Sequence, residues 1–78
     1  MILINSSGKH AYPINNFELY VARLSIFVRN VYTGDQTAVA TFDSSVNALA
    51  ALEDIIDSLR DDCSVYNLSY SNGVIHDT

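Results

Sequence analysis

The sequence lacks the features that mark disulfide-stapled, zinc-binding or membrane-spanning chains. Its single cysteine, Cys63, excludes an internal disulfide and a zinc site built from cysteines. No apolar run approaches the roughly 18 residues that a membrane helix needs. The apolar run at residues 1–4 is short and has no basic flank, so we expect no signal peptide. Only four lysines and arginines stand against nine acids, which excludes a protein that binds nucleic-acid phosphates directly.

The composition nevertheless describes a chain that folds on its own. Hydrophobic residues make up 49% of the 78 residues and charged residues only 17%, so the chain has enough apolar surface for a core. The formal net charge is −5. We therefore expect residues 1–78 to form one acidic, soluble, intracellular domain.

The first half of the sequence predicts β-strands. Residues 2–5 form a short candidate strand, and residues 6–16 resemble a loop because they hold Ser-Ser-Gly and Pro-Ile-Asn-Asn. Residues 17–32 are rich in strand formers, but the apolar positions change from odd to even numbers. We therefore place a bulge or bend near Ala22 and Arg23. A short helix over 17–24 is the alternative, because its apolar residues also fit helical spacing.

A turn, a strand and a helix follow. Residues 33–36 predict a turn around Gly34, and residues 37–42 a return strand. Short oxygen-bearing side chains at 43–45 are typical of a helix N-cap. A helix over 45–60 presents one apolar stripe, which Val46 and Ile55 widen, made of Leu49, Leu52, Ile56 and Leu59.

The last segment predicts a hairpin. Residues 65–71 form a candidate strand, Asn72-Gly73 is a strong turn signal, and residues 74–76 would pair back. The whole chain therefore predicts an α+β fold. We expect an antiparallel sheet of four to five strands with one amphipathic helix packed on one face, in the order β-β-β-α-β-β.

The acids are unevenly distributed. Five of the nine lie within one stretch of ten residues, in the second half of the predicted helix and directly after it: Glu53, Asp54, Asp57, Asp61 and Asp62. Residues 53, 57 and 61 are four apart and form one line, and Arg60 is the only base nearby. Like charges at this spacing, close to a helix C-terminus, oppose folding slightly. One interpretation is a solvated face that provides solubility; the other is an acidic ridge that meets a basic surface.

Tyrosine is the commonest aromatic residue, and it suits interfaces because it combines large contact area with a polar tip. Tyr20 and Tyr32 neighbour the proposed bend and a polar turn, so both are candidate partner-binding residues. Tyr66 and Tyr70 alternate with Leu68 and fit packing within a sheet.

The sequence gives little support for metal binding or catalysis. His10, His76 and Cys63 are the only soft metal ligands and none is paired at a ligand spacing, so we expect no metal and no cofactor. Cys63 is expected to be a buried or half-buried structural thiol. The sequence shows no arrangement of a nucleophile with an acid or a base that would support catalysis. We therefore expect that the protein is not an enzyme.

One segment resembles a known family. The sequence VRNVYTG at 28–34, followed after seven residues by FDS at 42–44, resembles V-x-N-V-x-x-G-x7-F-D-S of small phage anti-CRISPR proteins that block type I-F surveillance complexes. The resemblance implies an antiparallel sheet packed on helices, and binding to the backbone subunits of the complex, so that target DNA cannot pair with the guide. Arg29 stands where that family has a contact glutamate, so no contact residue is carried over.

Two functional hypotheses follow. The first is an anti-CRISPR inhibitor in the cytoplasm of the bacterial host. It would bind a CRISPR effector protein stoichiometrically and block DNA binding, partly as a DNA mimic through the acidic helix face. The second is a self-associating structural or regulatory phage module, in which a sheet edge pairs two copies as a homodimer.

Overall fold

The computed structural model describes residues 1–75, and antiparallel strands form the middle of the fold. Strands β3 (Phe17–Ala22), β4 (Ser25–Asn30) and β5 (Gln36–Phe42) are neighbours, and β7 (Val74–Ile75) pairs with β5 on its other side. One helix, α1 (Ser45–Arg60), contacts β3, β4 and β5. The predicted α+β class, with a four-stranded antiparallel sheet and one packed helix, is confirmed.

The break predicted near Ala22 and Arg23 is a complete reversal of the chain. Ala22 pairs with Ser25 across a turn in which Arg23 has a positive φ of 57°. Residues that face each other across a two-residue turn have opposite parity, as Val21 and Ile26 do. This explains why the apolar positions switch from odd to even while Leu19, Val21, Ile26 and Val28 all face the same core. The alternative helix over 17–24 is wrong, because β3 occupies that segment.

The next turn and strand agree with prediction more closely. The chain turns after β4 at residues 31–35, where the Gly34 N–H donates to the carbonyl of Asn30 and Gly34 has a φ of 77°. The register of β5 shifts opposite Ile26 and Phe27, which leaves Val39 between two paired positions. Both Val39 and Ala40 are buried as a result.

A second sheet lies at the N-terminus, with the order β2-β1-β6. Strand β1 (Ile2–Ile4) pairs antiparallel with β2 (Ala11–Pro13) and parallel with β6 (Val65–Asn67). The prediction of a loop over 6–16 is therefore wrong in part, because β2 and the 3-10 helix η1 (Ile14–Asn16) lie within it. A three-residue strand is too short to show a period, and only its pairing with β1 defines it.

The hairpin predicted at the C-terminus does not form. The chain leaves β6 after Asn67 and continues as the 3-10 helix η2 (Leu68–Tyr70), and β7 then pairs with β5 instead of β6. The Asn67 side chain accepts hydrogen bonds from the N–H and the hydroxyl of Ser69, an arrangement that competes with extended backbone. His76 lies outside the described residues.

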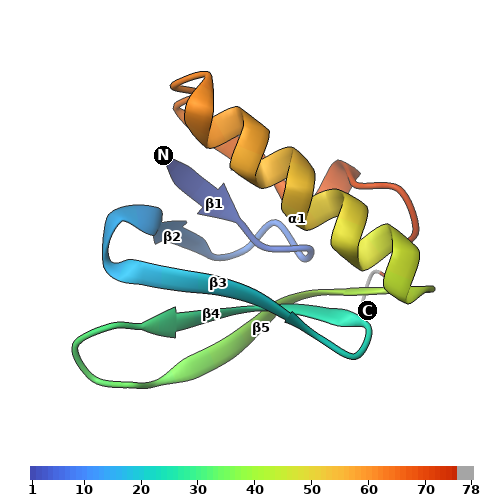
Figure 1. Cartoon of the computed structure of the whole chain (residues 1–78), viewed down its shortest axis with the longest axis horizontal. Coiled ribbons are helices and arrows are strands. Elements are labelled where there is room, and N and C mark those ends of the chain that lie inside the picture. The colour runs from blue at the N-terminus through green and yellow to red at the C-terminus, as the bar shows by residue number, and fades with distance from the viewer. Residues whose placement is uncertain (76–78) are drawn as a thin grey trace.

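Helix α1 begins and ends where the sequence predicts. The Ser44 hydroxyl accepts a hydrogen bond from the N–H of Asn47 at 3.2 Å, which satisfies one of the unpaired donors of the first turn. Figure 1 shows α1 on one side of β3, β4 and β5, with the turn that joins β4 to β5 far from it.

The buried face of α1 is not the predicted stripe. The helix buries Ala48, Ala51 and Ile55, whereas Leu49, Ile56 and Leu59 are exposed and Leu52 is half-buried. Most of the large, fully buried side chains come from other elements, among them Phe42, Leu3, Ile26 and Leu68. These side chains fill the space below the helix, and a narrow alanine face fits above them.

Candidate interaction surface

The predicted acidic residues are all exposed and lie on α1 and directly after it. Glu53, Asp54 and Asp57 belong to the helix, Asp61 is its C-cap residue, and Asp62 follows with a positive φ of 56°. We call Glu53, Asp57 and Asp61 the acidic line. The four-residue spacing sets these carboxylates on one side of the helix, as predicted.

Little positive charge compensates the acidic line. Arg60 lies 3.8 Å from the Asp57 carboxylate, and both side chains are largely exposed, so this ion pair stabilises the fold by less than about 1 kcal/mol. The other ion pair among residues 1–75 joins Arg29 to Glu18 at 3.5 Å on the sheet. The acidic line therefore keeps most of its negative charge.

The exposed aliphatic residues of α1 lie beside the acidic line. Val46 is 73% exposed and Leu49 is 51% exposed, and Ile56 and Leu59 are exposed to a smaller degree. We call Val46, Leu49, Ile56 and Leu59 the aliphatic stripe. Glu53 follows Leu49 by four residues and precedes Ile56 by three, so its carboxylate borders the stripe. The outward face of α1 therefore combines negative charge with apolar surface that the described residues leave uncovered.

Tyr20 does not lie with the acidic residues. Its neighbours Leu19 and Val21 pack against the core, so Tyr20 points to the opposite face of the sheet. There it stacks on Phe27 with the ring centroids 5.3 Å apart, and its hydroxyl donates to Gln36. The side of the sheet that faces away from α1 holds this aromatic pair.

Tyr32 is also separate from the acidic line. It lies in the turn between β4 and β5 and is 80% exposed. Its backbone N–H donates to the side chain of Asn30, which orders the turn. The structure thus brings the predicted acids together but leaves the two predicted tyrosines on other parts of the surface.

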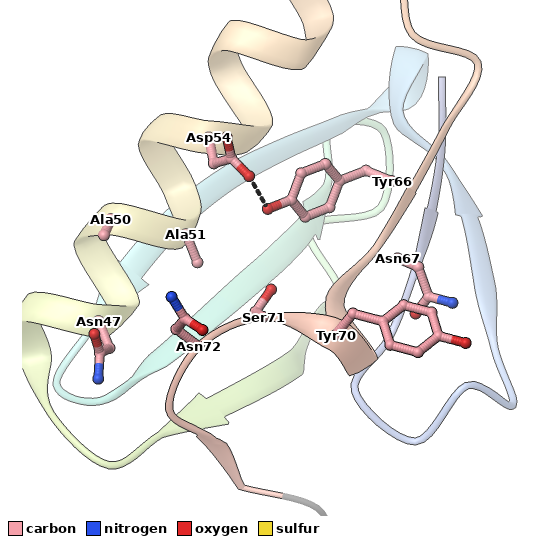
Figure 2. Close-up of a pocket in the computed structure, with 9 residues that line it drawn as sticks. All are labelled: Asn47, Ala50, Ala51, Asp54, Tyr66, Asn67, Tyr70, Ser71 and Asn72. Carbon is pink, nitrogen blue, oxygen red and sulfur yellow. Dashed lines mark hydrogen bonds between the residues drawn. The ribbon is translucent and has the colours of Figure 1, made fainter.

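A cleft lies between α1 and residues 66–72, and the sequence did not indicate it. It has a volume of about 500 Å³. Figure 2 shows the side chains of Asp54, Tyr66, Ser71 and Asn72 around one space, whereas Asn67 and Tyr70 point away from it. We call Asp54, Tyr66, Ser71 and Asn72 the cleft group. No local pattern reveals this group, because the helix and the C-terminal segment meet only in the folded chain.

A hydrogen bond closes one end of the cleft. The Tyr66 hydroxyl donates to Oδ2 of Asp54 at 2.6 Å. Burial raises the pKa of Tyr66 to about 12, and the bond to Asp54 and the nearby carboxylate charge act in the same direction. The Ser71 hydroxyl is near enough to oppose this rise, but its Oγ is buried and does not reach hydrogen-bond geometry with any group.

Potential metal ligands do not cluster in residues 1–75. This part of the chain contains no group of three or more His, Cys, Asp and Glu side chains placed to hold a metal ion. Cys63 is exposed, so the expectation of a buried or half-buried thiol is wrong; the residue lies in the turn after α1. The described part also holds no helix long and apolar enough to cross a membrane.

Comparison with known proteins adds no relative. No protein-family model, no curated protein and no solved structure matches this chain. The surface of α1 and the cleft beside it are therefore the features that indicate function.

Proposed function

We propose that this protein is an anti-CRISPR inhibitor that acts by stoichiometric binding in the cytoplasm of the bacterial host. The outward face of α1 docks on a basic, nucleic-acid-binding surface of a CRISPR effector complex and excludes target DNA from it. One observation carries the proposal: the aliphatic stripe is exposed directly beside the acidic line. The short resemblance at residues 28–44 points to the same class of target.

The combination of charge and apolar surface favours docking over mere solubility. A face that only keeps a protein in solution needs charge, and exposed leucine and valine side chains work against that purpose. A protein interface uses both, because the apolar centre supplies affinity while charges at the rim set orientation and partner choice. Leu49 and Glu53, one turn apart on α1, place an apolar side chain next to a charged one in this way.

The sign of the charge indicates the kind of partner. Glu53, Asp57 and Asp61 have only Arg60 beside them, so the face attracts a surface lined by lysine and arginine. Protein channels that hold nucleic acid are lined by lysine and arginine in this way. In a parallel pair of α1 helices from two copies, the acidic lines would lie side by side and repel each other. Self-association of this face in a parallel arrangement is therefore disfavoured.

A double charge reversal tests the proposal. Asp57→Lys with Asp61→Lys reverses the acidic line, and cations near the helix C-terminus suit the helix dipole, so the variant keeps its fold. We expect it to lose inhibition of target-DNA binding by a purified type I-F surveillance complex. Inhibition by the unaltered protein should weaken as salt concentration rises.

The matched control is Glu18→Lys with Asp35→Lys, which makes the same change in charge on the sheet and its turn. This control should inhibit as the unaltered protein does. Full inhibition by the Asp57/Asp61 variant would refute the helix face as the contact. A stable dimer in sedimentation that also fails to bind the complex would favour the self-associating module.

A further inference from the structure

The cleft between α1 and residues 66–72 offers hydrogen-bond acceptors that the fold does not use. Asp54 receives the Tyr66 hydroxyl through Oδ2, and Oδ1 forms no hydrogen bond with residues 1–75. Within the same part of the chain, the Asn72 side chain makes no hydrogen bond, and Ser71 Oγ is buried without a partner. Figure 2 shows the side chains of Asp54, Ser71 and Asn72 at the border of one space.

Other polar residues at the edge of the cleft are bonded elsewhere or point away from it. The Asn47 amide donates to Asp43 Oδ1 at 2.7 Å, next to the start of α1. The Asn67 side chain accepts from Ser69, and Tyr70 points away from the cleft. Ligand binding in the cleft therefore depends on the side chains of the cleft group.

The charge of the cleft selects the ligand. Among residues 1–75, its lining includes one carboxylate, Asp54, and no lysine, arginine or histidine. An anion would meet no positive charge there, whereas a cation would pair with Asp54 and with the field of the acidic line. The ligand class that fits is therefore cationic and rich in hydrogen-bond donors.

The size and lining of the cleft restrict the class of ligand further. A volume of about 500 Å³ accommodates a long side chain, and the methyl groups of Ala50 and Ala51 line one wall beside an apolar stem. A guanidinium presents five donors in a plane, which suits acceptors that approach from several directions. A lysine ammonium offers three donors at a single point and would leave part of the acceptor set unused.

We propose that this cleft is the recognition pocket for one arginine side chain of the protein on which α1 docks. The inference deepens the proposed function and rests on it for the identity of the partner, because Asp54 lies on α1 one turn from Asp57. Asp54 binds the guanidinium through Oδ1, and the Asn72 side chain accepts from one of its remaining donors. Tyr66 holds the carboxylate in place.

Titration with a small probe tests the pocket without the effector. Nα-acetyl-L-argininamide added to the 15N-labelled protein should shift the backbone signals of Asp54, Tyr66 and Asn72 with millimolar affinity. Asp54→Asn should lower that affinity about tenfold, since a charged hydrogen bond is lost while the Tyr66 partner remains. Asn72→Ala, at an exposed position, should lower it about threefold.

Asp57→Asn is the matched control, because it removes the same charge from the same helix outside the cleft. It should change the affinity less than twofold. No shift at the cleft, or an equal loss in Asp54→Asn and Asp57→Asn, would overturn the proposal. Shifts of the same signals by methyl glucoside but not by the argininamide would show a neutral sugar site and also overturn it.

Failure of the arginine pocket can be distinguished from failure of the proposed function. The argininamide titration uses the protein alone, whereas the proposed function is tested by DNA binding to the surveillance complex. If the probe binds normally and the Asp57/Asp61 variant still inhibits, the pocket stands and the helix-face docking fails. If the probe does not bind and that variant loses inhibition, the docking stands and the arginine pocket fails.

Discussion

The Tyr66 hydroxyl and the Asp54 carboxylate are joined by a 2.6 Å hydrogen bond that ties the middle of β6 to α1. The donor belongs to a strand paired with the N-terminal β1, and the acceptor to the helix that covers the other sheet. This bond therefore connects the N-terminal sheet to the helix through a polar contact outside the apolar core. It also fixes one wall of the cleft.

The first prediction concerns alkaline pH. The pKa of Tyr66 is raised from 10.0 to about 12 in the folded protein, so the folded state retains a proton that the unfolded chain has lost. The contribution of Tyr66 to stability is fully present below about pH 10 and disappears as pH rises through about 12. We expect the unfolding free energy of the unaltered protein to decline more steeply in this window than that of Tyr66→Phe. Denaturant titrations at several alkaline pH values measure this difference, and parallel declines would contradict it.

The second prediction concerns Gly73, which has a φ of +73°. A Cβ atom at this position would lie 2.3 Å from Asn47 Nδ2 and 2.5 Å from Asp43 Oδ1, where the C-terminal segment meets the start of α1. Gly73→Ala should therefore lower the unfolding free energy by about 2–3 kcal/mol, from backbone strain and from loss of the Asn47–Asp43 hydrogen bond when these two side chains move aside.

Gly34→Ala is the matched control for Gly73. Gly34 has a similar φ of +77°, but no atom lies within 4 Å of the added Cβ. Its cost should be limited to the backbone term, about 1–2 kcal/mol. Equal losses for the two alanine variants in urea unfolding would show that Gly73 is not in close contact with Asn47.

The third prediction compares two aliphatic residues of α1. Ile55 is fully buried and Leu49 is 51% exposed. Ile55→Ala should destabilise the protein by about 2–5 kcal/mol, because it opens a cavity below the helix. Leu49→Ala should change stability by less than about 1 kcal/mol and yet weaken binding to the effector, because its side chain faces the partner. Thermal unfolding and an affinity measurement separate the two effects; a large stability loss in Leu49→Ala would refute the assigned face.

Local chemistry made part of this fold predictable from the sequence. The oxygen-bearing side chain of Ser44 marked the start of α1, and the helical spacing of aliphatic residues up to Leu59 marked its end. The change of parity located the reversal at Arg23, although a bend and a reversal leave the same trace in an apolar pattern. In each case the cause lies within a few residues of its effect.

Long-range pairing was not predictable in the same way. The short β2 is a strand only because it pairs with β1, and β7 pairs with β5 rather than with β6 in the folded chain. The buried side of α1 depends on how much space Phe42 and its neighbours occupy, and no property of the helix alone specifies this. The same reasoning applies to the surface: spacing located the acidic line, but the contact of Asp54 with Tyr66 required the complete fold.

The most direct measurement of the central claim is site-specific photo-crosslinking to the purified type I-F surveillance complex. A photo-reactive residue is introduced in place of Leu49, on the outward face of α1, or of Ala38, which pairs with Phe27 and is exposed on the opposite face of the sheet. The account predicts that position 49 crosslinks to effector peptides rich in lysine and arginine that line the DNA-binding surface, and that position 38 does not. Crosslinks from position 38 alone, or from neither position, would contradict it.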